Sequence, residues 1–320
     1  MRILLGLLAT ASGLFAAVDG TVVNATTGKP QPSVIVILVQ PTAQGPQTVA
    51  TVKSDAEGKF KIDKDVPGTA IVQGIYQGVL YSLVLPPGTP TTGVHLKVYD
   101  ATSKPGVAVI SQHMILIEPG TNSLEVSETF LIENETTTTF QDSVKGSVQF
   151  YLPEAAGGKV NVTINSPGGV PIQRPAEKTK EKDVYKIAYP IRPGESRFDV
   201  SYSLPPADTF ASKILHGDGV TRLVTPSTVT LEGSGIESLG QEPQTKAHIY
   251  SADAADYSVR ITGTGSLRNQ EAAAPDEDTG ESQGLEEKPA RVYSRMYWVL
   301  GMAFAILGLG GVLLYRKPTA

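Results

Sequence analysis

Apolar and polar residues alternate along most of this chain, in short runs separated by turn residues. Between residues 18 and 100 the alternation predicts strands with one face toward a core and the other toward water. We expect these strands at Asp19–Asn24, Val34–Gln40, Gln47–Lys53, Lys59–Asp63, Thr69–Tyr76, Val79–Leu85 and Val94–Tyr99. Short strands at this spacing, with Gly and Pro between them, are typical of an antiparallel β-sandwich.

The alternation continues in a second region, residues 107–205. Its clearest apolar faces are Val148, Phe150 and Leu152, then Val160, Val162 and Ile164, then Phe198, Val200, Tyr202 and Leu204. Turn residues at 167–169 and 192–195 separate its strands, and the mixed charges of 177–183 indicate a solvated hairpin tip. We therefore expect a second antiparallel sandwich in tandem with the first.

A shorter β region follows the hinge at Pro205-Pro206. Its strands are expected near Thr221–Val224, Thr228–Leu231, Ala247–Tyr250 and Tyr257–Thr262. The pattern leaves open whether residues 206–265 complete the second sandwich or form a small third domain.

The alternation gives way to an unbroken apolar run at 296–315. About 20 residues without a charge are enough to cross a hydrocarbon core as one helix. Aromatic rings at both ends of the run are typical of the membrane interface. Gly301, Ala305 and Gly308 form a small-residue stripe on this helix, which predicts a weak homodimer.

The segments around the β regions predict how the chain is placed in the membrane. Residues 1–17 resemble a secretory signal, with an uncleaved anchor as the alternative. Residues 266–290 are acidic with scarcely an apolar side chain, so we expect a disordered linker. Residues 18–290 would then lie outside the membrane, with a cytoplasmic stub at 316–320.

Composition narrows the classes of function. Charged residues make up 18% of the chain and the net charge is −5, so nothing suggests a nucleic-acid surface. The absence of cysteine excludes disulfides, thiolate metal sites and a cysteine nucleophile. Because a secreted animal domain of this kind would often carry disulfides, we expect a bacterial cell-membrane protein.

Short motifs at the start of the chain point to a family. They are Val18-Asp19-Gly20-Thr21-Val22, Thr27-Gly28-Lys29-Pro30, Val34-Ile35-Val36, Thr51-Val52-Lys53-Ser54-Asp55-Ala56-Glu57-Gly58-Lys59-Phe60 and Pro67-Gly68. Together they resemble the carboxypeptidase regulatory-like domain. The resemblance covers the first quarter of the chain and implies a transthyretin-like (prealbumin) sandwich, often grouped with carbohydrate-binding-like folds. Thr69-Ala70 replaces the family's usual aromatic, which leaves the implied fold intact but weakens any inherited binding surface.

Histidines and carboxylates give no recognisable catalytic pattern. His95, His113, His216 and His248 fall in separate segments without metal-binding spacing. We interpret them as surface or strand-edge residues. Asp55 and Glu57 are expected to form an Asx turn ahead of Gly58 rather than a calcium site.

Three Asn-X-Thr triplets match the N-glycosylation pattern, at Asn24, Asn134 and Asn161. Thr-rich strands generate such triplets by chance, and in a bacterium we expect these positions to stay unmodified.

No catalytic, cofactor-binding or metal-ligating residue is assigned from the sequence. We therefore predict a non-enzymatic, membrane-anchored binding or scaffold protein of the envelope, with a polysaccharide or an envelope protein as ligand. One alternative is a structural or assembly subunit of a membrane complex. The other is a hydrolase whose site assembles from scattered Ser, His and Asp residues.

Overall fold

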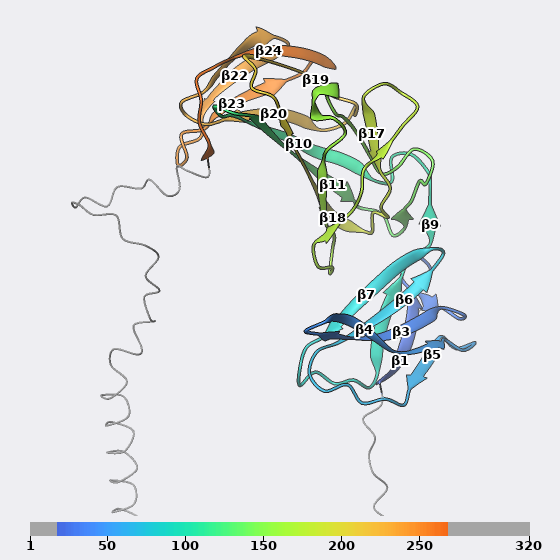
Figure 1. The fold of residues 1–320 in the computed structure, drawn as a ribbon. Coiled ribbons are helices and arrows are strands. Elements are labelled where there is room, and N and C mark those ends of the chain that lie inside the picture. The colour runs from blue at the N-terminus through green and yellow to red at the C-terminus, as the bar shows by residue number, and fades with distance from the viewer. Residues whose placement is uncertain (1–17, 268–320) are drawn as a thin grey trace, which may run out of the picture. The chain divides into compact units, whose positions relative to one another are not determined.

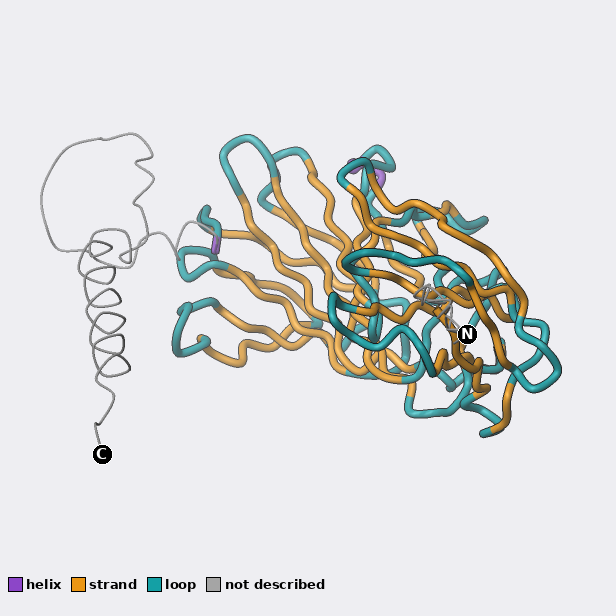
Figure 2. Tube along the Cα trace, turned by 90° about the horizontal axis from the view of Figure 1, so that it is seen from below, coloured by secondary structure: helices purple, strands orange, loops and turns teal. Residues whose placement is uncertain are grey.

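The computed structural model describes residues 18–267, and this part of the chain is almost entirely β (Figures 1 and 2). Within these residues a short 3₁₀ turn lies at Glu154–Ala156, and no helix is long and apolar enough to cross a membrane. The mainly-β prediction is confirmed. The expected signal at 1–17, the acidic linker beyond 267, the apolar run at 296–315 with its glycine stripe, and the stub at 316–320 lie outside the described residues.

The first group of strands forms two facing sheets. Its strands are β1 (Val18–Asn24), β2 (Lys29–Pro30), β3 (Ile35–Thr42), β4 (Gly45–Lys53), β5 (Lys59–Ile62), β6 (Ala70–Tyr76), β7 (Val79–Leu85) and β8 (Val94–Val98). One sheet has the order β2-β1-β5 with β8 paired to β1, and the other has the order β4-β3-β6-β7. Val22, Val36, Phe60 and Leu96 are at most 4% exposed and fill the core shared by these sheets.

All seven strands predicted for residues 18–100 are present, with bounds that differ by at most two residues. The pairing departs from the expected antiparallel sandwich at one place, because β8 runs parallel to β1. The backbones of these two strands meet closely at Gly20. A Cβ added there would lie 1.9 Å from the carbonyl oxygen of Val94. Glycine is therefore required at this position.

The second group builds a larger sheet system. Its strands are β9 (Ala101–Thr102), β10 (Val109–Pro119), β11 (Leu124–Asn134), β12 (Thr139–Phe140), β13 (Val148–Tyr151), β14 (Asn161–Asn165), β15 (Ile172–Gln173), β16 (Glu177–Lys178), β17 (Val184–Ile187), β18 (Gly194–Leu204), β19 (Thr209–Lys213), β20 (Val220–Thr225), β21 (Thr230–Ser234), β22 (Ile236–Gln241), β23 (His248–Ala252) and β24 (Asp256–Thr262). Eight of them form one sheet in the order β15-β14-β18-β11-β10-β20-β23-β22.

Strands from residues 206–265 belong to this same sheet. β20 pairs in parallel with β10, β23 pairs with β20, and β22 pairs with β23. The small sheet β19-β24-β21 shares its core with the large one, since Phe210 and Val259 are buried in one cluster with Ile115 and Leu223. β9 and β12 form a further parallel pair. The prediction of purely antiparallel sheets is therefore wrong at three strand pairs.

Asx turns end several strands. The Oδ1 atom of Asn24 accepts a hydrogen bond from the backbone N–H of Thr26 at 2.9 Å, and that of Asn134 accepts one from Thr136 at 3.1 Å. Both Asn residues are 2% exposed, whereas Asn161 is exposed. Two of the three glycosylation-like triplets are thus turn motifs rather than chance matches.

Asp55 also forms the predicted Asx turn. Its Oδ1 accepts hydrogen bonds from the backbone N–H groups of Glu57 at 3.0 Å and Lys59 at 2.7 Å. The carboxylate is therefore engaged by the backbone of its own turn, as the sequence predicts.

Candidate ligand-binding cleft

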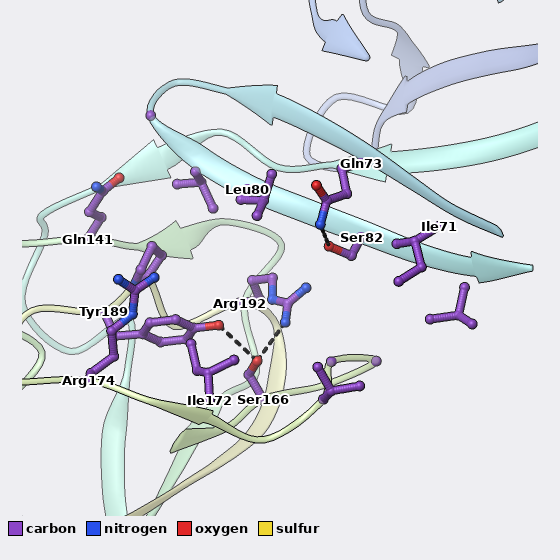
Figure 3. A pocket seen from close by; sticks show the side chains of 17 residues that line it. Ile71, Gln73, Leu80, Ser82, Gln141, Ser166, Ile172, Arg174, Tyr189 and Arg192 are labelled. Atoms are coloured by element: carbon purple, nitrogen blue, oxygen red, sulfur yellow. Dashed lines mark hydrogen bonds between the residues drawn. The ribbon is translucent and has the colours of Figure 1, made fainter. Parts of the chain in front are cut away.

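A cleft of about 350 Å³ opens beside the outer face of β6 and β7 (Figure 3). Alternation along the two strands sends Val72 and Tyr81 into the core and leaves their neighbours on the outer face. The residues of this wall include Ile71, Gln73, Leu80, Ser82 and Val84. The first wall is therefore mainly aliphatic, with one polar contact between Gln73 and Ser82 at 3.4 Å.

The second wall comes from the hairpin between β14 and β15 and from residues 189–192. The hairpin turns at Gly168, whose φ of 64° is readily adopted by glycine. At the next residue a Cβ would lie 3.1 Å from Ser166 Oγ and 3.2 Å from Arg192 Nη2. Gly169 thus lets the guanidinium approach the turn closely.

A polar cluster occupies this second wall. Arg192 Nη2 donates a hydrogen bond to Ser166 Oγ at 2.6 Å, and Ser166 shares another with the Tyr189 hydroxyl at 3.1 Å. The guanidinium carbon of Arg174 lies 5.9 Å from the centre of the Tyr189 ring, within cation–π range. Figure 3 shows these side chains facing the outer surface of β6 and β7.

The two arginines of the cleft have no anionic partner within the described part of the chain. The ion pairs of residues 18–267, taken at nitrogen–oxygen distances up to 4.0 Å, include neither Arg174 nor Arg192. Arginine placed in this way suits carboxylate recognition, because its planar group offers donors in a fixed fork. The cleft therefore joins a positive wall to an aliphatic one.

Exposed apolar side chains cluster at the same cleft. Leu80 is 48% exposed, Val84 41% and Val170 67%, and all three line it. The large exposed apolar residues of the described chain are aliphatic or methionine, with no aromatic side chain among them. An apolar strip beside a polar cluster is typical of a surface that binds a partner.

A second constellation lies inside the core of the large sheet. His113 Nε2 is 3.0 Å from Glu128 Oε2, and both side chains are 3% exposed. The Tyr202 hydroxyl donates to Glu128 Oε1 at 2.8 Å, and burial raises the pKa of Tyr202 well above its usual range. The His113 ring stacks on Phe130, with centroids 4.0 Å apart.

His216 extends this chain of polar groups. Its Nε2 lies 3.1 Å from His113 Nδ1, and its Nδ1 lies 2.6 Å from the carbonyl oxygen of Asp218. The contacts from Glu128 through His113 and His216 to Asp218 therefore form one continuous chain of polar groups. Burial lowers the pKa of His216.

The histidines differ from the sequence interpretation at one position. His95 is exposed on β8, and His248 is half-buried with a contact of 3.2 Å to Gln241. The interpretation of His113 as a surface or strand-edge residue is wrong, because alternation places it on the core face with Ile115. Across residues 18–267, no three His, Asp or Glu side chains converge to hold a metal ion.

The cleft and the buried pair are separate places in the fold. Neither His113 nor Glu128 lines the cleft, and their 3% exposure gives a substrate no access to them. Sequence reasoning did not identify either constellation. The sequence does contain one indication of the buried pair, because Glu128 interrupts the apolar face of β11 between Val126 and Phe130. The sequence places Arg192 in a turn and does not indicate its position in the cleft.

The described chain is thus a mainly-β protein with sandwich-like sheets and a cleft of mixed aliphatic and cationic character. No family matches the sequence, and no curated protein matches it. Among solved structures, a mutant of the M1 zinc metallopeptidase from Deinococcus radiodurans is similar over 48% of this chain and 42% of that chain, with 11% identity and a TM-score of 0.26.

The same mutant bound to a Tyr-Ser-Ala substrate matches with 13% identity over 48% of this chain and 43% of that chain, again at a TM-score of 0.26. The chain therefore spans less than half the length of these peptidases. Similarity at this TM-score carries no argument about activity.

Proposed function

We propose that this chain is a membrane-anchored, non-enzymatic binding or scaffold protein of the bacterial envelope, which holds an envelope protein in the cleft beside β6 and β7. The observation that carries the proposal is the pairing of an aliphatic wall with arginines that lack an anionic partner among the described residues. Binding surfaces combine an apolar area with a few placed polar groups in this way.

A protein ligand fits this cleft better than a polysaccharide. Sugar rings stack on exposed aromatic side chains, and none of the large exposed apolar residues of the described chain is aromatic. The Tyr189 ring in the cleft already has the Arg174 guanidinium over one face. Leu80, Val84 and Val170 instead offer the aliphatic contact that a polypeptide partner buries.

In this proposal the remaining parts of the chain hold the cleft outside the membrane and anchor it there. In the proposal, residues 18–100 are a carboxypeptidase regulatory-like domain of transthyretin-like fold, and the sandwich-like packing of β1–β8 supports that assignment. The segment 296–315 anchors the chain, and 266–290 spaces the β regions from the bilayer. Protease added to spheroplasts should digest residues 18–290. Digestion only after the inner membrane is opened would contradict this orientation.

Site-specific photo-crosslinking in native membranes tests the cleft as the binding site. A photoreactive residue at Leu80, on the aliphatic wall, should give a discrete adduct with a protein, identified by mass spectrometry. The matched control is Val144, which is 82% exposed and lies outside the cleft. Equal adducts at the two positions, or adducts at Val144 alone, would overturn the proposal.

A further inference from the structure

We propose that the ligand of the cleft is an acidic segment of a partner polypeptide, and that Arg192 and Arg174 hold one of its carboxylates. This inference rests on the proposed function, since it names the chemistry of the partner at the same site. It goes further by assigning a subsite for a negatively charged side chain.

Arg192 is positioned for this role before any ligand arrives. Its hydrogen bond of 2.6 Å to Ser166, and the hydrogen bond of Ser166 to Tyr189, fix the guanidinium in the wall of the cleft. A guanidinium has five N–H donors, and this bond uses one of them. Because these hydrogen bonds already hold the side chain, less conformational entropy is lost when a carboxylate binds.

Arg174 supplies a second positive charge to the same wall. It is exposed on the chain that leaves β15, and its guanidinium lies over the Tyr189 ring. Two cations in one concave surface, with no carboxylate of the described chain paired to them, attract an anionic group. Arg192 also borders a neighbouring smaller cleft with His95 and Lys97, so a longer acidic segment meets further basic groups there.

The aliphatic wall favours an acidic polypeptide over other acidic ligands. An extended polypeptide directs alternate side chains to opposite sides, so a segment that alternates acidic and aliphatic residues presents both kinds to a cleft. The acidic side chains would meet Arg192 and Arg174, and the aliphatic ones would cover Leu80, Val84 and Val170. An acidic polysaccharide supplies the carboxylates but no aliphatic side chains for the opposite wall.

Binding of defined probes to the full chain tests the inference. The probe is a fluorescent eight-residue peptide of alternating Glu and Val, followed by anisotropy. Its matched control has Gln at each Glu position, and polygalacturonate serves as an acidic polysaccharide. We expect the Glu peptide to bind, the Gln peptide to bind at least about tenfold more weakly, and the binding to weaken as salt rises.

Variants locate the binding. Arg192→Gln should weaken Glu-peptide binding by roughly tenfold or more, because a charge-assisted hydrogen bond is lost. Arg260→Gln, at an exposed arginine of β24, should leave it unchanged. A second pair of variants leaves both arginines of the cleft unchanged. Val170→Glu places a carboxylate at the cleft and should also weaken binding, whereas Val144→Glu should not.

The outcomes separate this inference from the proposed function. Equal binding of the Glu and Gln peptides, or equal effects of Arg192→Gln and Arg260→Gln, would overturn the acidic-segment inference. A crosslink at Leu80 would in that case still support the cleft as a binding site. Displacement of the Glu peptide by polygalacturonate at matched carboxylate concentration, with tighter binding of the polymer, would assign the subsite to polysaccharide instead.

The acidic run of this protein itself could also occupy the cleft, and a further variant distinguishes it from a partner protein. Residues 271–287 include seven Asp and Glu side chains, and a second copy could supply them to the cleft. A variant with these residues changed to Asn and Gln should bind the Glu peptide as the natural chain does. Tighter binding by this variant would show that the acidic run of this same protein occupies the cleft, and would overturn a different protein as the partner.

Discussion

Glu128 and His113 are joined by a contact of 3.0 Å between Oε2 and Nε2 in the middle of an apolar core. They are not direct cross-strand neighbours, because β11 places Glu128 opposite Ile115 and places Phe130 opposite His113. The contact therefore runs diagonally across two strands. Tyr202, from β18, completes the set of partners for the carboxylate. A polar group in this position has to be fully satisfied to be tolerated.

Removing one member of this pair should destabilise the fold strongly. We expect Glu128→Leu and His113→Leu each to lower the free energy of unfolding by about 3–5 kcal/mol, because the remaining group stays buried without its partner. The double variant should lose clearly less than the sum of the two, since an apolar pair suits the surrounding core. Denaturant unfolding of the three variants measures the coupling.

A control on the same strand separates this effect from strand propensity. Glu133 is exposed on β11, and Glu133→Leu should change the free energy of unfolding by no more than about 0.5 kcal/mol. Additive effects of the two core substitutions would show that Glu128 and His113 contribute independently, contrary to this account.

The stability of the chain should decline as the pH falls below about 6.5. Burial lowers the pKa of His216 in the folded state from the ordinary value of 6.5, so the unfolded chain binds more protons in this range. The His216 contribution is intact above pH 6.5 and is lost as the pH falls toward the folded pKa. Thermal unfolding of His216→Gln should show a shallower dependence of stability on pH between pH 7.5 and 5 than the natural chain shows.

The Asx-turn asparagines should be essential to local stability. Asn134 Nδ2 donates to the carbonyl oxygens of Thr138 at 2.8 Å and Ile191 at 3.0 Å, and Asn134→Ala removes both hydrogen bonds. We expect a loss of about 2 kcal/mol in the free energy of unfolding. Asn161→Ala, at an exposed position, should change it little. Similar losses at both positions would contradict the role given to the buried amide.

Gly20 should not tolerate a side chain. A Cβ at this position would meet the backbone of Val94, which cannot rotate away, so Gly20→Ala has to push β1 from β8. We expect a loss of about 3 kcal/mol, at the upper end of overpacking effects. Gly217→Ala is the matched control, because its added Cβ meets nothing within 4 Å. Differential scanning calorimetry compares the two.

The strands of the first group, β1–β8, could be predicted in detail because the pattern that specifies each strand is local in the sequence. Each strand has a period of two and is bounded by turn residues such as Asp55 and Gly58, so existence and limits follow from neighbouring positions. The parallel pairing of β1 with β8 does not follow in this way. It joins residues about seventy positions apart, and the strand pattern is the same for either direction.

The cleft could not be predicted, because its walls come from distant segments. Leu80 and Val170 look like ordinary strand and turn residues, and only the tertiary fold brings them to one cavity with Arg192. The buried pair carried a partial signal. His113 stands two residues before Ile115 on an alternating face, which predicts burial, but the sequence does not identify Glu128 as its partner.

The parallel pairing of β1 and β8 also determines how the first β unit responds to tension. These strands are the first and last of the unit, and five residue pairs from Gly20–Val94 to Asn24–Val98 join them side by side. Force applied to the two chain ends pulls the strands past one another lengthwise, so their evenly spaced hydrogen bonds share the load and break together. A hairpin arrangement would unzip bond by bond. We therefore expect these eight strands to resist stretching from their two chain ends.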